Sequence, residues 1–233
     1  MAYTFVLFCT ANDHIRIGIA FVLALSFGIS ALLLNWLTLD GVRAAVLFGT
    51  ISYGIGDLLG ASVVLGFFIT SSLVSQNQEV SAFDNRPDTK RFRRDGAQVW
   101  ANGFWFALFI LIWFVSDAEI LLFAAIGSIA AANADTWATE IGGNYRPGKT
   151  WLITNFTSVA PGTDGGVSIK GLLAALLGSA VIAGIVWLLR MDTPWPYLVI
   201  LSLSGFVGSI ADSILGATVQ NTQVKLSGKV YRI

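Results

Sequence analysis

The sequence predicts an all-α integral membrane protein, a polytopic helical bundle of about six to seven transmembrane segments that forms one domain over residues 1–233. Composition is the first observation behind this prediction. Of the residues, 55% are hydrophobic and 12% are charged, whereas about a quarter of a soluble domain is charged. The second observation is a series of apolar runs, since about 20 apolar residues cross the hydrocarbon core. The net charge of zero supplies no basic field, so no nucleic-acid partner is expected.

The apolar runs follow one another along the chain at Ile15–Leu37, Val42–Ile55, Leu58–Val74, Gln98–Phe114, Ala118–Asn133, Gly171–Leu189 and Tyr197–Val219. The stretch from Val42 to Val74 is too long for one span. Gly54, Gly56 and Asp57 lie in its middle, where a helix is expected to break or turn. The sequence therefore predicts either two short helices or one broken, re-entrant element at this place.

The Lys and Arg residues indicate how the segments are oriented. If the connection at 76–97 is cytoplasmic and the segments alternate, only Arg16 and Arg190 of the fourteen basic residues fall outside. The predicted topology is therefore N-out and C-in.

Two acidic residues are candidates for catalysis and metal binding, because a carboxylate within a membrane segment is costly. Asp212 follows a stripe of small residues that includes Gly205 and Gly208, and Asp135 follows a similar stripe with Ala131. Such stripes let helices approach closely. If the two faces meet, Asp135 and Asp212 become neighbours and are expected to hold Mg²⁺, which prefers oxygen ligands. The alternative is that each carboxylate only hydrogen-bonds to nearby groups and fixes helix packing.

Further polar residues gather in two places at the same predicted face. Glu140 is a third catalytic candidate, although it also suits an interfacial cap. A glycine-rich turn before a helix is typical of an anion cradle, although ordinary turns are glycine-rich too and no Walker A motif is present. The predicted nucleotide and phosphate site comprises Gly162, Thr163, Asp164, Gly165, Gly166 and Lys170.

A basic juxtamembrane run follows the long polar connection. One interpretation is that this run sets the membrane topology and contacts anionic lipid head groups. The other is that it binds a lipid phosphate, because arginine offers a bidentate fork to phosphate. The side-chain amides of Gln98 and Asn102, one helical turn apart, continue the polar face beyond this run. The predicted lipid-phosphate site comprises Arg91, Arg93, Arg94, Gln98 and Asn102.

Five ordered motifs resemble one integral-membrane family, long catalogued as a domain of unknown function, that includes plant and cyanobacterial phytyl-phosphate kinase. They are Phe67–Ser72, Arg94–Gly103, Ala134–Gly142, Pro161–Ser168 and Gly208–Gln220. The resemblance implies a CTP-dependent kinase that converts an isoprenyl monophosphate, such as phytyl phosphate, to the diphosphate used for tocopherol.

The resemblance fits the residue-based hypothesis, in which Asp135 and Asp212 hold Mg²⁺ while the glycine-rich turn cradles CTP. The expected partners are CTP, the prenyl phosphate and the bilayer, either a cell membrane or a thylakoid-type membrane, with the active face cytoplasmic. Two alternatives stay open. A membrane cytidylyltransferase would use the same groups and release pyrophosphate, and a transporter of lipid phosphate or ions would favour polar groups near the middle of the membrane.

Overall fold

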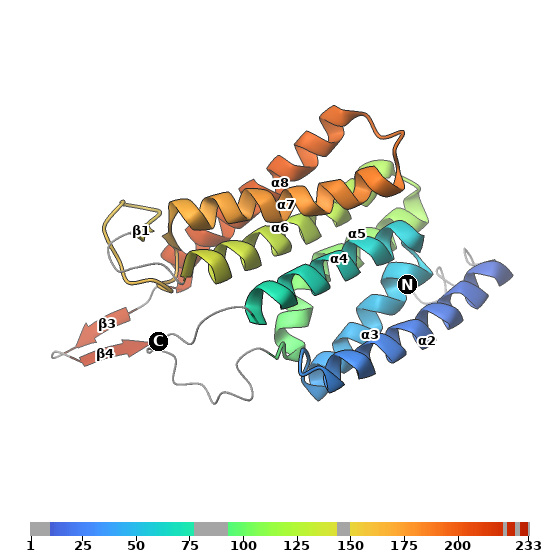
Figure 1. Ribbon diagram of the computed structural model, residues 1–233, viewed down its shortest axis with the longest axis horizontal. Helices are drawn as coiled ribbons and strands as arrows, with labels where there is room; N and C mark the ends of the chain where they lie inside the picture. The colour runs from blue at the N-terminus through green and yellow to red at the C-terminus, as the bar shows by residue number, and fades with distance from the viewer. Residues whose placement is uncertain (1–9, 77–92, 144–149, 221–222, 227–228, 233) are drawn as a thin grey trace.

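The computed structural model describes residues 10–76, 93–143, 150–220, 223–226 and 229–232. Seven long helices cover most of this part of the chain and run between two ends of an elongated bundle (Figure 1). They are α2 (Ala11–Leu33), α3 (Leu39–Gly54), α4 (Asp57–Gln76), α5 (Gly96–Ser116), α6 (Glu119–Gly143), α7 (Ile169–Leu189) and α8 (Trp195–Leu215).

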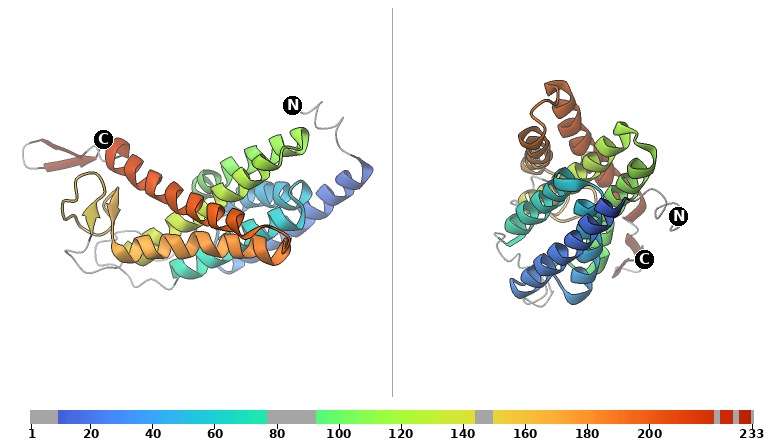
Figure 2. Two further views of the ribbon diagram at one scale, coloured as in Figure 1. Left: turned by 90° about the horizontal axis from the view of Figure 1, so that it is seen from above. Right: turned by 90° about the vertical axis from the view of Figure 1, so that its right-hand side faces the viewer.

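Short strands and one π-helical turn complete the structure. β1 (Trp151–Leu152) pairs antiparallel with β2 (Gly166–Val167), and the turn η1 (Gly216–Gln220) continues α8. The strands β3 (Gln223–Leu226) and β4 (Lys229–Arg232) form an antiparallel pair at the end of the chain. Figure 2 shows that the loop between β1 and β2 lies at the same end of the bundle as the C-terminal end of α8.

Six of the helices are long and apolar enough to cross a membrane, which confirms the predicted class of fold. The seventh, α3, has 16 residues and is about 24 Å long, shorter than a hydrocarbon core of about 30 Å. The predicted break is present, because α3 ends at Gly54 and α4 begins at Asp57, whose φ is 56°. The structure thus contains the two helices of the predicted pair.

Several helix starts follow directly from local sequence, because an N-cap side chain satisfies a backbone N–H that lacks a partner in the helix. Thr10 and Asp95 form reciprocal capping boxes at α2 and α5. Thr38 and Ser168 accept from the backbone N–H three residues later at α3 and α7. These caps set the ends at which the polar loops lie.

One helix, α6, lies at the centre and packs against α4, α5, α7 and α8. It continues ten residues beyond the predicted end at Asn133. Neighbouring helices supply hydrogen-bond partners to Asn133 and, further along, to Glu140. The buried Asn133 amide donates to Gly178 O at 2.7 Å and accepts from Thr70 Oγ1 at 3.2 Å. Tertiary packing therefore extends the helix through a polar segment.

Candidate functional site

The small faces of α6 and α8 meet, which is the condition under which the sequence makes Asp135 and Asp212 neighbours. A Cβ placed on Gly208 would lie 2.6 Å from Ala131 Cβ, and one on Gly205 would lie 2.8 Å from Ala130 Cβ. Ordinary contacts between carbon atoms are about 3.5–4.0 Å, so only glycine fits at these positions without movement. Because Asp135 and Asp212 lie four residues beyond Ala131 and Gly208, this contact carries both carboxylates to the same place.

Asp135 and Asp212 line one polar pocket of about 180 Å³ at the end of the bundle. Asp135 is half-buried and Asp212 is exposed, and the two carboxylates are close enough to act on each other electrostatically. The predicted neighbourhood of these residues is thus present in the structure. The pocket is smaller than those that enclose whole ligands, about 300–1,000 Å³, and its size suits phosphate groups rather than a complete nucleotide.

The glycine-rich loop forms the opposite wall of this pocket, with Gly162, Thr163, Asp164, Gly165 and Gly166 all in its lining. Gly162 and Gly165 have φ of 81° and 74°, a region that strains residues with a side chain. Some backbone N–H groups of the predicted phosphate cradle form hydrogen bonds within the loop itself. The N–H of Gly166 donates to Thr163 O at 2.8 Å, and the N–H of Thr163 donates to Ala160 O at 3.2 Å.

The loop is held in place from both sides. A side chain at Gly165 would collide with Ala217 in η1, so the loop lies directly on the end of α8. On the other side β2 leads into α7, whose N-cap Ser168 also lines the pocket. The N-terminus of α7 therefore faces the same pocket, and its dipole favours an anion there.

Sequence reasoning did not assign a role to three hydroxyl residues that line this pocket, Thr139, Ser209 and Ser213. Each is one helical turn or less from a candidate aspartate, since Thr139 lies four residues after Asp135 and Ser209 lies three before Asp212. That spacing was the available signal, because residues three or four apart share a helix face.

Glu140 and Lys170 were predicted to join this site, but neither lines the pocket. Glu140 points toward α4, where it accepts a hydrogen bond from Ser75 Oγ at 2.9 Å. Lys170 is exposed in the first turn of α7. The structure therefore separates Glu140 from the two aspartates.

The described residues of the predicted lipid-phosphate site likewise do not all line one cavity. Arg91 lies outside the described residues, and Gln98 is exposed and completes the capping box of α5 with Asp95. Arg93 is partly buried, and its Nε finds no hydrogen-bond partner among the described residues. Only Arg94 and Asn102 line a common cavity, and it is not the polar pocket.

The segment that carries Arg94 is fixed by backbone hydrogen bonds to the connection between α2 and α3. The N–H of Arg94 donates to Trp36 O at 2.9 Å, and its carbonyl accepts from the N–H of Thr38 at 3.0 Å. The Arg94 guanidinium lies over the rings of Phe67 and Phe68, 5.2 and 5.8 Å from their centroids. Burial lowers the pKa of Arg94 to about 10, an effect that the charge of Glu140 opposes, so the side chain is cationic at neutral pH.

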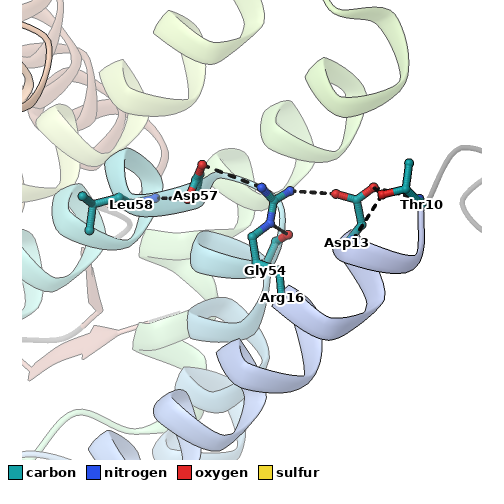
Figure 3. A network of polar contacts seen from close by, with 6 residues as sticks. All are labelled: Thr10, Asp13, Arg16, Gly54, Asp57 and Leu58. Carbon is teal, nitrogen blue, oxygen red and sulfur yellow. Dashed lines mark hydrogen bonds and ion pairs between the residues drawn. The ribbon is translucent and has the colours of Figure 1, made fainter.

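A separate polar network lies at the other end of the bundle (Figure 3). Arg16 Nε donates to Gly54 O at 3.0 Å, and its guanidinium also contacts Asp13 at 3.1 Å and Asp57 at 3.7 Å. Asp57 Oδ1 accepts from the N–H of Leu58 at 2.8 Å. This network joins α2 to the break between α3 and α4, which agrees with the interpretation of Asp57 as a turn residue.

The donor set of the polar pocket fits Mg²⁺. Within the described part of the chain, no group of three or more His, Cys, Asp or Glu residues has the arrangement of a protein metal cage. Mg²⁺ does not need such a cage, because it is usually held by one or two carboxylates together with substrate phosphates and water. Asp135 and Asp212 supply those two carboxylates.

A bundle of apolar helices with a polar pocket at one end is the architecture of an integral membrane protein. The chain belongs to the family described as Integral membrane protein DUF92, which matches residues 22–232. This match confirms the family assignment that the five motifs indicated.

Three of the individual relatives come from one plant and one archaeon. Protein PGR of Arabidopsis thaliana is 32% identical over 213 residues, which cover 79% of this chain and 72% of that protein. Protein VTE6, chloroplastic, of the same plant is 29% identical over 202 residues, which cover 83% of this chain and 60% of that protein. Uncharacterized membrane protein MJ0933 of Methanocaldococcus jannaschii is 35% identical over 158 residues, covering 66% of this chain and 63% of that protein. No solved structure matches the chain significantly.

Proposed function

We propose that this protein is a CTP-dependent kinase of isoprenyl monophosphates, with phytyl phosphate among its substrates, acting at the cytoplasmic face of the membrane. One observation carries the proposal: carboxylates from α6 and α8 and a glycine-rich loop before α7 converge on one small polar pocket at the end of an apolar bundle. The resemblance to the family that includes phytyl-phosphate kinase supports it, as does the similarity to VTE6.

In this mechanism the terminal phosphoryl group of CTP passes to an oxygen of the prenyl phosphate, giving CDP and prenyl diphosphate. Such a transfer depends on positioning and charge stabilisation more than on a protein nucleophile. Asp135 and Asp212 would hold Mg²⁺, which neutralises charge on the phosphates. The loop from Gly162 to Gly166 and the N-terminus of α7 would position the phosphates of CTP.

The acceptor phosphate is already an anion at neutral pH, so its oxygen needs no strong general base. The protein must instead hold two negatively charged substrates close together. The hydroxyls of Thr139, Ser209 and Ser213 offer neutral donors in the pocket for this purpose. The prenyl tail needs an apolar environment, which the bundle provides.

The test is turnover by the purified protein reconstituted in lipid nanodiscs, with CTP, Mg²⁺ and phytyl or geranylgeranyl monophosphate, and with products identified by mass spectrometry. Asp135→Asn and Asp212→Asn should each lower kcat at least about 100-fold, the usual loss when one group that stabilises the transition state is removed. Asp192→Asn is the matched control, because Asp192 is exposed in the connection between α7 and α8, at the other end of the bundle. Chelation with EDTA should abolish turnover reversibly.

The products decide between the proposal and its rivals. Pyrophosphate with a CMP-linked lipid would identify a cytidylyltransferase instead. Absence of any product, together with movement of lipid phosphate across the bilayer of sealed proteoliposomes, would identify a transporter. If either aspartate variant loses its folded state in size-exclusion chromatography, the packing role of that carboxylate gains support.

A further inference from the structure

The described helices line a second, partly open cavity, larger and far more apolar than the polar pocket. It has a volume of about 480 Å³ and lies between α2, α3, α4 and α5, with Ile129 of α6 at one wall. Its lining includes the aromatic residues Phe27, Phe48, Phe67, Phe68 and Phe106. A volume in the range of about 300–1,000 Å³ is typical of sites for small organic ligands.

The cavity is elongated. On α4 alone its lining extends from Leu58 to Phe68, ten residues or about 15 Å along the helix. The shape and apolar walls suit a single extended hydrocarbon chain. At one end the lining changes, because Arg94 and Asn102 are its charged and amide members.

Arg94 is the second and independent observation. Its Nη1 is completely buried and has no hydrogen-bond partner among the described residues. The charge of Glu140 acts on Arg94, but the Glu140 carboxylate accepts a hydrogen bond from Ser75. A buried cation without a hydrogen-bonded acceptor is costly, and an anionic head group beside the guanidinium would lower that cost.

We infer that this cavity is the binding site of the acceptor lipid, with the isoprenyl tail between α2 and α5 and the phosphate on the guanidinium of Arg94 and on Asn102. The identity of the lipid rests on the proposed function, whereas the combination of apolar chain and anionic head follows from the cavity itself. Arginine suits the head because its fork holds two phosphate oxygens.

The position of the apolar cavity determines where the lipid phosphate would receive the phosphoryl group. Arg94 precedes α5, and the start of α5 lies at the same end of the bundle as the polar pocket (Figure 1). The head of a lipid held in the cavity is therefore presented at the end where the aspartates and the glycine-rich loop lie. The tail extends toward the other end, away from the nucleotide.

The experiment measures binding without nucleotide, so that its outcome does not depend on catalysis. Full-length protein in nanodiscs is titrated with farnesyl monophosphate and with farnesol, and affinity is read by native mass spectrometry. The unsubstituted protein should prefer the phosphate, and Arg94→Met should lower that preference about 10-fold to 100-fold, the range for a hydrogen bond to a charged group. Arg43→Met, at an exposed arginine of α3, should leave it unchanged.

The tail is tested by filling the cavity. Ala61 of α4 lines it, so Ala61→Phe should weaken binding of farnesyl and geranylgeranyl phosphate at least tenfold and spare the shorter geranyl phosphate. Ala101→Phe is the matched control, because Ala101 is exposed on α5 and lines neither cavity.

Each result supports or overturns the inference. Equal binding by all variants would overturn it even if the kinase is active, and phosphate preference lost in Arg94→Met would support it even if no turnover is found. Displacement of farnesyl phosphate by phosphatidate at equal concentration would show a general membrane-lipid groove instead. A folded Ala61→Phe that retains binding of the long tails would exclude the cavity as the tail site.

Discussion

The contact between Gly208 and Ala131 should control turnover, because it sets the distance between the two carboxylates. In Gly208→Ala the new Cβ would start 2.6 Å from Ala131 Cβ. A normal carbon contact needs at least about 3.5 Å, so α8 must move away from α6 by about 1 Å at this point. Asp212 lies one turn further along α8 and moves with it.

The substitution is expected to affect both the stability and the catalytic rate. Overpacking costs about 1–3 kcal/mol, and replacing glycine by alanine within a helix returns about 0.5–1 kcal/mol. The net loss in the free energy of unfolding is therefore at most about 2.5 kcal/mol, less than the usual stability of about 5–15 kcal/mol. A displacement of about 1 Å in a catalytic group can lower the rate about 100-fold, so kcat should fall in a protein that is still folded.

The assay compares kcat of CTP-dependent prenyl phosphate phosphorylation with thermal unfolding in the same detergent. Gly184→Ala is the matched control, since Gly184 is also inside a helix but nothing lies within 4 Å of its added Cβ. That variant should be equally active and slightly more stable. If Gly208→Ala keeps the kcat of Gly184→Ala, the α6–α8 contact does not position the aspartates and the reasoning is refuted.

Three further outcomes are expected. Gly165→Ala should weaken CTP binding at least tenfold, because the new side chain collides with Ala217 and has a strained φ. In Gly162→Ala the added Cβ meets nothing within 4 Å, so CTP binding should show only the effect of the strained φ. Isothermal titration calorimetry compares the CTP affinities of the two variants. Asn133→Ala should lower the free energy of unfolding by about 2 kcal/mol, measured by chemical denaturation, because it removes the two hydrogen bonds of the buried amide, to Gly178 O and from Thr70 Oγ1. The hydrogen bond from Thr38 and then that from the Gly96 N–H hold the pKa of Asp40 below its ordinary 3.8, so this stabilisation is present above pH 3.8 and is lost as the pH falls through the folded-state pKa. Thermal unfolding from pH 6 to pH 3 should therefore change less in Asp40→Asn than in the unsubstituted protein.

The number of helices and the break at Gly54–Asp57 were predictable because both depend on local properties. Apolar length fixes a span, and glycine with a turn-forming aspartate ends a helix wherever it lies in the fold. The meeting of α6 and α8 was predictable only as a condition. The absence of side chains at Gly205 and Gly208 leaves a surface that suits another small face, but the sequence did not show that the face of α6 occupies it. The pocket around Asp135 and Asp212 follows from that contact.

The sequence did not indicate which of the remaining polar residues line the polar pocket and which lie elsewhere. Glu140 and Asp135 are close in the chain, and only the packing of α4 against one side of α6 shows that they face different neighbours. Arg94 resembles the other basic residues of its run, and its burial depends on backbone hydrogen bonds to Trp36 and Thr38, which are far away in sequence. The apolar cavity likewise has no local signal, because its lining comes from five helices.

The position of α6 gives the two proposed sites a common wall. Asp135 of α6 lines the polar pocket and Ile129 of α6 lines the apolar cavity, so one helix contributes to both sites. A change on α8 reaches only the polar pocket, whereas a change that shifts α6 reaches both sites. Gly208→Ala should therefore lower kcat while leaving the affinity for farnesyl phosphate intact. Loss of lipid binding in that variant would mean that α6 itself moves, and that the nucleotide and lipid sites are coupled through it.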